Sequence, residues 1–347
     1  MRRVSISEIM HETGLSRATV DRVLNRRGRV HPRTRVAVEE TLRRLEAPDG
    51  AKPPPGPPVD IVLRLGRGML SQMRAAWDAV SPSGRFLDLY QGRENDVVAA
   101  VRDLGQDLSR PLVIAAKNTD RLTDQLRRLR QRGKRVIAVV SDLASDARDC
   151  FVGIDNRAAG QTAAFLIGQG IGDKPASVGV VVGDSAFRCH EDREIGFRTG
   201  LRAHFPKIAL AAEARGEDNS DLTREAVARM LSAHPDLSAV YNVGGGNLGL
   251  AQAIRDAGRG TDVIVVGHEV NSVTAPLLRE GAMTFAIASD PCELLSEALR
   301  LAVASSDEPM RDSVQFDFAV YTRFNLPKFG IAASIPREAR KHADDAI

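Results

Sequence analysis

PLVIAAKNTDRLTDQLRRLRQRGKRVIAVV, residues 111–140, shows how most of this chain is built. The apolar runs PLVIAA and RVIAVV at its two ends have the length of buried strands. Residues 119–132 between them are long enough for a helix. A helix that joins two continuously apolar strands is typical of a parallel sheet covered on both faces. The stretch is therefore predicted to fold as strand, helix and strand.

The same alternation runs from Val59 to about residue 318. Eight more apolar runs are predicted as strands, which makes ten with the two above: 59–65, 85–90, 150–154, 177–183, 238–243, 262–267, 284–289 and 314–318. Helices are expected between most of them, for example at 157–169, 190–203 and 221–233. About ten strands are many for one open sheet, so two similar α/β lobes of about 130–150 residues each are predicted.

SISEIMHETGLSRATVDRVLNRRGRVHPRTRVAVEETLRRL, residues 5–45, precedes this body and has a helical pattern. Ser5 followed by Glu8 has capping-box spacing, so a first helix is predicted to begin there. Gly14 tolerates positive φ and marks a turn, after which Ser16 can cap a second helix. A third helix is predicted from Pro32 to about residue 45.

Charge and composition separate this head from the body. Residues 1–46 carry a net charge of +5, and the remainder sums to −2. A basic head on a slightly acidic body predicts that the head alone meets a polyanion. The intervening EAPDGAKPPPGPP, residues 46–58, is rich in proline, which lacks the N–H that a helix needs. A semi-rigid linker is predicted there.

The order of cap, glycine turn, second cap and basic outer face predicts a helix-turn-helix that reads double-stranded DNA. The second helix would lie in the major groove, where arginine can donate paired hydrogen bonds to guanine. The alternative is a small helical bundle with a solvated basic face. The residues expected at DNA are Ser16, Arg17, Ala18, Thr19, Asp21, Arg22, Asn25 and Arg29.

GLSRATVDRVLN (14–25) and VHPRTRVAVEETLRRL (30–45) resemble the signatures of the LacI family of bacterial regulators. The resemblance implies an all-α helix-turn-helix domain followed by a two-lobed, periplasmic-binding-protein-like (type 1) α/β body. The implied ranges are 1–46 for the head, 47–58 for the linker, and 59–340 for the body, with lobe 1 at about 59–157 and 291–321 and lobe 2 at about 158–290 and 322–340. Asp21 departs from the family's serine, and the linker lacks its hinge-helix motif.

Ligands of doubly wound folds bind beyond the carboxyl ends of the strands, which here means the cleft between the lobes. Polar residues follow several predicted strands, and VGIDNRAAG (152–160) resembles a motif shared with sugar-binding proteins. Asp155 can instead cap the following helix, and Arg193 can form a surface salt bridge. The resemblance implies ligand contacts from Asp155, Arg193, Asn242, Glu269 and Asp290, with Phe187 and His190 flanking a sugar ring.

Together these features predict a DNA-binding transcriptional regulator, a repressor, that acts as a homodimer on operator DNA. A small carbohydrate or polyol would be its effector. No cofactor, no metal and no enzymatic activity are expected. Two alternatives stay open. One is a sugar-binding module whose head binds protein, and the other is a carbohydrate-active enzyme with a carboxylate pair such as Asp155 and Glu269.

The cysteines and the chain's start bear on location. Cys150, Cys189 and Cys292 are odd in number, far apart and free of any C-x-x-C pair, so neither a disulfide framework nor a zinc site is predicted. MRRVSISEIM lacks an apolar signal core. No run of about 18 apolar residues could span a membrane. A cytoplasmic protein without a membrane partner is predicted.

Overall fold

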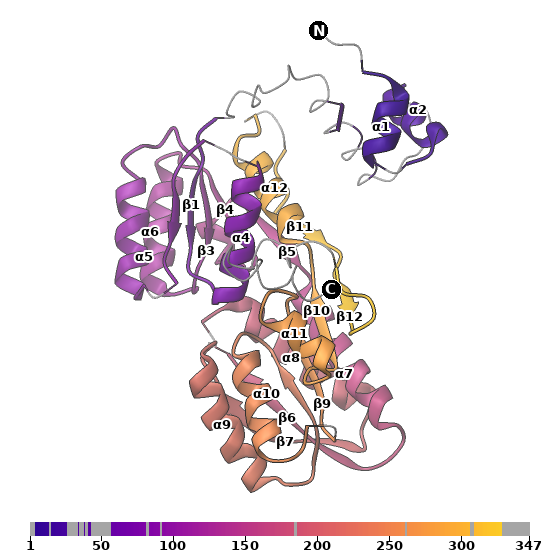
Figure 1. The fold of residues 1–347 in the computed structure, drawn as a ribbon. Helices are drawn as coiled ribbons and strands as arrows, with labels where there is room; N and C mark the ends of the chain where they lie inside the picture. Colours follow the sequence, from indigo (N-terminus) through magenta and orange to yellow (C-terminus); the bar gives the residue numbers. More distant parts are fainter. Residues whose placement is uncertain are drawn as a thin grey trace, which may run out of the picture. The chain divides into compact units, whose positions relative to one another are not determined.

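The computed structural model divides into two compact units, residues 1–56 and 57–347, each described by itself. It describes residues 4–13, 15–25, 34, 38, 41–42, 57–80, 83–90, 92–183, 186–260, 262–305 and 309–327. Figure 1 traces the chain in sequence colours. Gly14, Arg29, the linker up to residue 56 and most of the predicted third helix lie outside the described residues.

The first unit contains helices α1 (Ile6–Thr13) and α2 (Arg17–Leu24). The Glu8 carboxylate accepts from the Ser5 backbone N–H at 2.8 Å and from its hydroxyl at 2.9 Å. The Ser16 hydroxyl accepts from the Thr19 N–H at 3.3 Å. The predicted starts of both helices are thus confirmed. A small core closes the unit, made of the buried side chains Ile9, Val20, Val23 and Val38.

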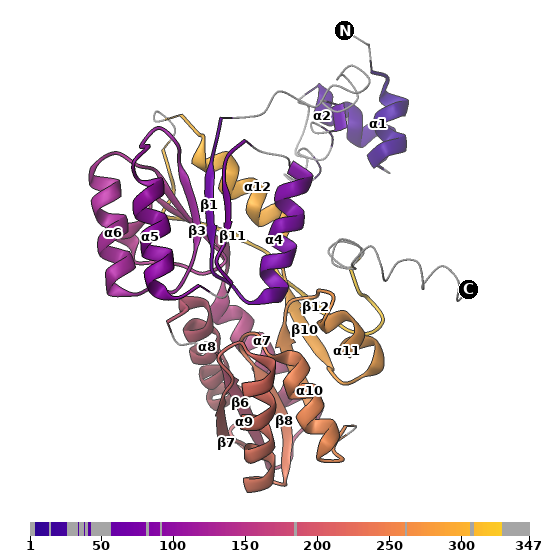
Figure 2. The same ribbon diagram turned by 60° about the vertical axis from the view of Figure 1, so that its left-hand side comes forward.

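Lobe 1 of the second unit is a sheet in the order β11-β5-β4-β3-β1-β2, in which every paired strand is parallel. Its strands are β1 (Asp60–Leu63), β2 (Phe86–Asp88), β3 (Leu112–Ala115), β4 (Val136–Val139), β5 (Cys150–Ile154) and β11 (Ser313–Phe316), with a 3-10 turn at Ser145–Ala147. One face is covered by α4 (Arg67–Val80) and α12 (Pro291–Ala302), and the other by α5 (Glu94–Leu104) and α6 (Asp120–Gln131), as Figure 2 shows.

Lobe 2 repeats this plan with the order β12-β10-β9-β8-β6-β7. Its strands are β6 (Ala176–Val182), β7 (Ile208–Arg215), β8 (Leu237–Asn242), β9 (Ile264–His268), β10 (Phe285–Ala288) and β12 (Ala319–Tyr321). β12 runs antiparallel to β10. Helices α7 (Asn156–Ile171) and α8 (Arg188–His204) cover one face, and α9 (Ser220–Ala233), α10 (Asn247–Asp256) and α11 (Thr274–Glu280) the other.

The two-lobed α/β body and the ten predicted strands are confirmed. Two strands were not predicted. β7 is an edge strand whose alternating alanines are only partly buried, so its sequence lacks a continuous apolar run. β12 is three residues long and half-exposed, which is too short for a periodic signal.

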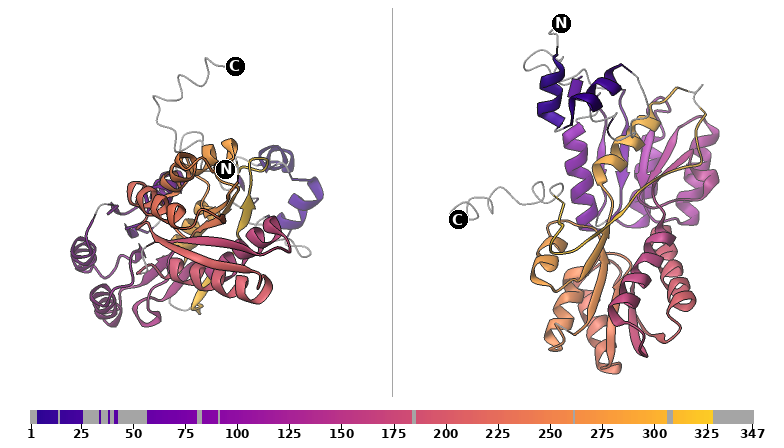
Figure 3. Two further views of the ribbon diagram at one scale, coloured as in Figure 1. Left: turned by 90° about the horizontal axis from the view of Figure 1, so that it is seen from below. Right: turned by 90° about the vertical axis from the view of Figure 1, so that its right-hand side faces the viewer.

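The described part of the second unit crosses between its lobes at 154–156, 288–291 and 316–319. Figure 3 shows the yellow C-terminal segment passing from one lobe to the other. The last crossing therefore precedes Tyr321, whereas the sequence predicted it at 321–327. Among the helices in the described ranges, none combines the length and apolarity needed to cross a bilayer.

Candidate functional site

A cavity of about 370 Å³ lies between the two lobes, at the carboxyl ends of both sheets. Its volume falls within the range of about 300–1,000 Å³ that is usual for small-molecule sites. Lobe 1 contributes Leu65, Gly66, Arg67, Gly68, Met69, Tyr90 and Val140. Lobe 2 contributes the larger share of polar groups, among them His190, Arg193, Asp218, Asn247, Glu269 and Asn271.

Backbone strain is concentrated at this cavity. The non-glycine residues with positive φ in the described part of the chain are Val140 (69°), Glu217 (49°), Asp218 (57°) and Glu269 (69°). Three of them line the cavity, and Glu217 is adjacent to one that does. Left-handed geometry is unfavourable for residues with a Cβ and tends to persist where function requires it. The strain thus marks the same edge of the sheets as the cavity.

Arg193, on α8, is the buried cation of the site, with 7% of its surface exposed. Its Nε donates to Asn156 Oδ1 at 2.8 Å, and its Nη1 donates to the Val243 carbonyl at 2.9 Å. Both acceptors are neutral, and no ion pair to Arg193 is present among the described residues. A guanidinium held in this way is positioned without an ion pair to a carboxylate.

His190 and Cys189 lie one turn before Arg193 on α8, and both side chains are buried. His190 Nδ1 has no hydrogen-bond partner among the described residues and lies 3.9 Å from Asp218 Oδ2. Burial opposes protonation, but the Cys189 thiol and the Asp218 carboxylate raise the pKa of His190. His190 and Arg193 outweigh burial and lower the pKa of Cys189 to about 7. Phe187 packs its ring 5.3 Å from the His190 ring.

Glu269 follows β9 and meets lobe 1 at the first turn of α4. Its Oε2 accepts from Asn271 Nδ2 at 3.0 Å. A Cβ placed on Gly68 would lie 2.1 Å from Asn271 Nδ2 and 3.0 Å from Glu269 Oε2, so only glycine permits this approach. Burial raises the pKa of Glu269 to about 7. The carboxyl therefore changes charge near neutral pH.

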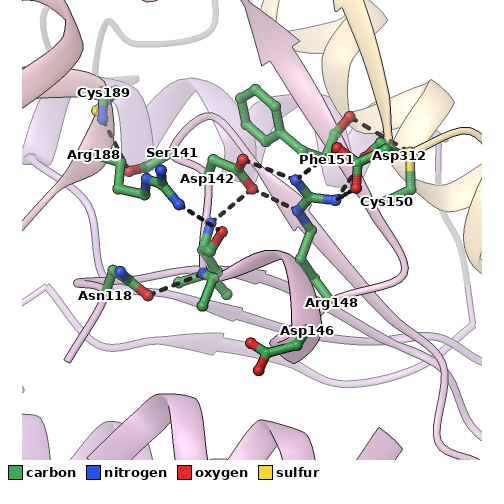
Figure 4. Close-up of polar contacts among 12 residues, drawn as sticks. Asn118, Ser141, Asp142, Asp146, Arg148, Cys150, Phe151, Arg188, Cys189 and Asp312 are labelled. Atoms are coloured by element: carbon green, nitrogen blue, oxygen red, sulfur yellow. Dashed lines mark hydrogen bonds and ion pairs between the residues drawn. The ribbon is translucent and has the colours of Figure 1, made fainter. Parts of the chain in front are cut away.

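Hydrogen bonds join the lobes around the cavity. Gln72 Nε2 on α4 donates to the Val270 carbonyl at 2.7 Å, and the Asn118 N–H donates to the Ala186 carbonyl at 2.8 Å. The Cys189 N–H donates to the Ser141 hydroxyl at 3.4 Å, which Figure 4 shows. The amino end of α8, which carries the cavity-lining Cys189 and His190, is thus attached to the loop after β4.

Asp155 lies at a different place from these residues. It is exposed and caps α7, accepting from the Ala158 N–H at 2.9 Å. It lines a separate cavity of about 230 Å³ beside the lobe crossings. There, the buried Arg148 donates to Asp142 at 2.6 Å and to Asp312 at 2.6 Å (Figure 4). Asp155 and Glu269 therefore do not form the carboxylate pair that the enzymatic alternative required.

Asn242 and Asp290 also lie outside the lining of the 370 Å³ cavity. Asn242 is fully buried, and its Nδ2 donates to the Gly245 carbonyl and to Asn247 Oδ1, both at 2.8 Å. It therefore shapes the glycine loop that carries the cavity-lining Asn247. Asp290 caps α12 by accepting from the Cys292 N–H at 2.8 Å. Of the predicted ligand residues, the structure brings together Phe187, His190, Arg193 and Glu269.

Sequence reasoning missed several residues of the cavity. Asp218 follows β7, and because that strand was not predicted, the loop after it drew no attention. Arg67, Gly68 and Asn271 follow strands that were predicted, so the rule of carboxyl ends could have found them. No group of three or more His, Cys, Asp or Glu side chains in the described ranges is placed to hold a metal ion.

Comparison with known proteins assigns the body to a family. Residues 95–308 match the model of the periplasmic binding protein domain. The chain therefore belongs to the family of proteins with a periplasmic binding protein domain.

Two curated relatives and one solved structure extend this assignment. The D-allose-binding periplasmic protein of Escherichia coli is 26% identical over 159 residues, 45% of this chain and 50% of the relative. The D-ribose/D-allose-binding protein of Pseudomonas aeruginosa is 31% identical over 179 residues, 47% and 52% of the two chains. The chain thus spans about half the length of these relatives. A solved structure, an ABC transporter solute-binding protein of Burkholderia graminis in complex with D-arabinose, aligns with a TM-score of 0.73 at 19% identity. The alignment covers 80% of this chain and 99% of that protein, so the two share a fold.

These relatives correct the predicted function. They are named as sugar-binding and solute-binding proteins, so the prediction of a DNA-binding transcriptional regulator of the LacI type, a repressor, is wrong. Operator DNA and an operator-bound homodimer are withdrawn as partners for the same reason. The cytoplasmic location is also contradicted, because the allose-binding relative is periplasmic by name. Binding proteins are not enzymes, which agrees with the expectation of no enzymatic activity.

The regulator prediction failed because the motifs of the head specify helix ends and not a binding partner. Capping residues and a glycine turn fix where helices begin and end, but they do not fix a partner. The predicted contact residues Arg17, Ala18, Arg22 and Asn25 are exposed on α2, Thr19 and Asp21 are half-buried, and Ser16 is the exposed cap. Arg22 donates to the Ala18 carbonyl at 3.1 Å, and Asn25 to Asp21 Oδ1 at 2.8 Å. An exposed polar helix face of this kind carries no partner-specific chemistry by itself.

Proposed function

We propose that this chain is a solute-binding protein whose ligand is a monosaccharide held in the 370 Å³ cavity between its lobes. The observation that carries the proposal is the buried, carboxylate-free Arg193, which shares the cavity with the acids Glu269 and Asp218. Carboxylates accept hydrogen bonds from adjacent hydroxyls, and a guanidinium donates to ligand oxygens. The sugars in the relatives' names support the same ligand class.

The roles of the side chains follow from their places at the cavity. Arg193 is proposed to donate to a ligand oxygen, and Glu269 to accept from, or donate to, a hydroxyl. Phe187 and His190 supply ring faces against the sugar. Asn242, Asp290 and Asp155 are assigned positioning roles at the glycine loop, α12 and α7, respectively, because each bonds to backbone or loop groups.

The domain organisation is kept as part of the proposal. Residues 1–46 form a helical domain, 47–58 a linker, and 59–340 the ligand-binding body, whose two lobes are joined at the crossings 154–156, 288–291 and 316–319. The separate core around Ile9 and Val20 and the division of the chain near residue 56 support this arrangement.

Thermal denaturation of the full chain with a panel of aldoses and their derivatives tests ligand binding. A ligand at about 100 times its Kd stabilises the native state by about 2.7 kcal/mol, which raises Tm by several degrees. Isothermal titration of any stabilising sugar then gives its affinity. If no sugar or sugar derivative of monosaccharide size shifts Tm, the proposed function is wrong.

A cavity-filling variant locates the binding. Gly66 lines the cavity, and a Cβ there would meet no atom within 4 Å, so Gly66→Phe places a ring in open space at the site. We expect it to lower affinity at least about tenfold by occlusion. Gly260 also has no atom within 4 Å of its Cβ position but lies away from the cavity. Gly260→Phe is therefore the matched control and should bind normally.

A further inference from the structure

Two arginines at the cavity, Arg193 and Arg67, make no ion pair among the described residues, whereas the Glu269 carboxyl accepts from the neutral Asn271. Arg193 has only neutral acceptors, as described above. Arg67, exposed at the start of α4, lies 5.2 Å from the Tyr90 ring centroid and has no carboxylate within ion-pair distance among the described residues. A buried cation without a counter-charge is costly, so a negative group in the cavity would offset that cost.

The acids at the cavity have local partners. Asp218 Oδ1 accepts from the Gly245 N–H at 2.6 Å, and its other oxygen lies 3.9 Å from His190. The charge of Asp218 also favours the protonated forms of Arg64 and Lys117 in lobe 1, and the charge of Glu217 favours protonated Lys117. Asp221 is exposed in the first turn of α9, where a helix dipole favours a carboxylate. Asp218 therefore has partners of its own, and none of these acids forms an ion pair with Arg193 among the described residues.

The first turn of α4 adds donors on the lobe 1 side. The N–H groups of residues 67–69 have no partner within the helix, as at any helix start. Gly66 leaves the start of this turn open, whereas Asn271 and Glu269 approach Gly68, and residues 66–69 all line the cavity. Helix starts favour anions. Together with Arg193, which is nine-tenths buried and lacks a counter-charge, the turn forms an anion-favouring pair of elements across one cavity.

From this balance we infer that the cavity selects a sugar acid, a monosaccharide-sized polyol bearing a carboxylate, over the matching neutral sugar. Arg193 and Arg67 balance the ligand's charge from the two lobes. The inference rests on the proposed function and adds the charge of the ligand to it.

Glu269 makes the inference testable by pH. In addition to burial, the pKa of Glu269 is shifted by the charges of Arg193, Asp218, His190 and Cys189 in lobe 2. On the lobe 1 side, Glu269 lies against Gly68, which directly follows Arg67. Its pKa of about 7 means that it loses its proton near neutrality. A bound carboxylate favours the protonated form, so the affinity for a sugar acid rises as pH falls through 7. A neutral sugar whose hydroxyl donates to ionised Glu269 shows the opposite slope.

The experiment is isothermal titration of the full chain with matched pairs: D-allose and D-allonate, D-ribose and D-ribonate, D-arabinose and D-arabinonate. Each pair is measured at pH values below, at and above 7 and at constant ionic strength. We expect at least one acid to bind at least about tenfold more tightly than its neutral partner, as a charge-assisted contact allows. Its affinity should increase as pH falls, and Glu269→Gln should flatten that dependence.

Two exposed arginines supply the matched variants. Arg67→Gln should weaken binding of the acid about three- to tenfold more than binding of the matching neutral sugar. Arg229→Gln removes an equally exposed charge on α9 away from the cavity and should change neither. Equal losses for the acid and the neutral sugar in Arg67→Gln would overturn the assigned role.

The remaining outcomes separate the two proposals. A neutral sugar that binds as tightly as its acid, with affinity rising with pH, refutes the inference and leaves the proposed function standing. Tighter binding of D-ribose 5-phosphate than of any acid also refutes it, because the anion is then a phosphate. If neither sugars nor sugar acids bind, both proposals fail.

Discussion

The two lobes share one sheet order but place their buried charges at opposite edges. In lobe 1, Asp60 begins β1, is fully buried, and pairs with Arg85 at 2.6 Å and Arg110 at 2.7 Å. Lys134, also buried, precedes β4 and donates to the carbonyls of Leu104 and Asp107 at 2.7 and 2.8 Å. These charges lie at the amino ends of the strands, away from the cavity, and have partners.

In lobe 2 the buried Arg193 and His190 and the half-buried Glu269 line the cavity at the carboxyl ends of the strands. Arg193 has no carboxylate, His190 has an unpartnered Nδ1, and Glu269 has a raised pKa. The same architecture thus uses buried charge in two ways. Paired charges at the amino edge hold lobe 1 together, whereas incompletely paired charges at the carboxyl edge of lobe 2 are available to a ligand.

The largest expected effect tests the stabilising role of the paired charges. Asp60→Asn leaves Arg85 and Arg110 without their shared carboxylate, and breaking a buried pair costs about 3–5 kcal/mol. Denaturant unfolding should show that loss, while ligand affinity stays unchanged. Asp124→Asn is the control, because its pair with Arg127 is exposed and surface pairs contribute about 0–1 kcal/mol. Loss of affinity in the folded Asp60 variant would break the comparison between the lobes.

Glu269→Gln tests the opposite behaviour in lobe 2. Because the folded-state pKa is about 7 against an ordinary 4.5, the native state is penalised once the group ionises. Stability of the natural chain should fall as pH rises from about 4.5 to about 7, by up to about 3 kcal/mol. The glutamine variant should lack this fall and be the more stable protein at pH 8. Parallel stability–pH curves for the two proteins would contradict the assignment.

Gly68→Ala tests whether the lobes must approach closely. A Cβ there meets Asn271 Nδ2 at 2.1 Å, and overpacking of this kind costs about 1–3 kcal/mol. We expect an affinity loss of roughly five- to a hundredfold in titrations, because the lobes cannot close on the ligand. Gly66→Ala, two residues earlier and in open space, should bind normally. Equal affinities for the two variants would show that the approach is unimportant.

The smallest expected effect concerns a neutral buried pair in lobe 2. The Tyr241 hydroxyl lies 2.7 Å from His268 Nε2, and burial lowers the pKa of His268 well below its ordinary value. The neutral His268 ring donates its N–H to the Ile287 backbone, which leaves Nε2 to accept from the Tyr241 hydroxyl. Tyr241→Phe should cost about 1 kcal/mol in denaturant unfolding by leaving an unsatisfied acceptor. Adding His268→Leu to Tyr241→Phe should recover part of the lost unfolding free energy. If the second substitution instead lowers the unfolding free energy further, the hydrogen-bonded pair is refuted.

The cavity illustrates which site residues could be found from sequence. Arg193, His190 and Glu269 were identified because motifs and strand ends point to them. Asp155 was misplaced because a helix cap and a ligand carboxylate have the same sequence position after a strand. Asp218 was missed together with β7, whose small, half-exposed residues give no strand signal.

The head shows the limit of local motifs most plainly. Ser5, Glu8 and Ser16 correctly predicted where α1 and α2 begin, since capping depends on neighbours three residues away. The partner of those helices depends on groups that local spacing does not specify. The regulator prediction therefore failed although its helices were placed correctly.

By itself the sequence determined the α/β alternation, ten of the strands and the two-lobed body, because continuous apolar runs and helical spacing are local properties of the chain. Only the tertiary structure decided which strand-end residues meet in one cavity. It also decided which charges are paired, as for Asp60, and which are not, as for Arg193. Pairing and burial depend on contacts between residues far apart in sequence, for which no local pattern exists.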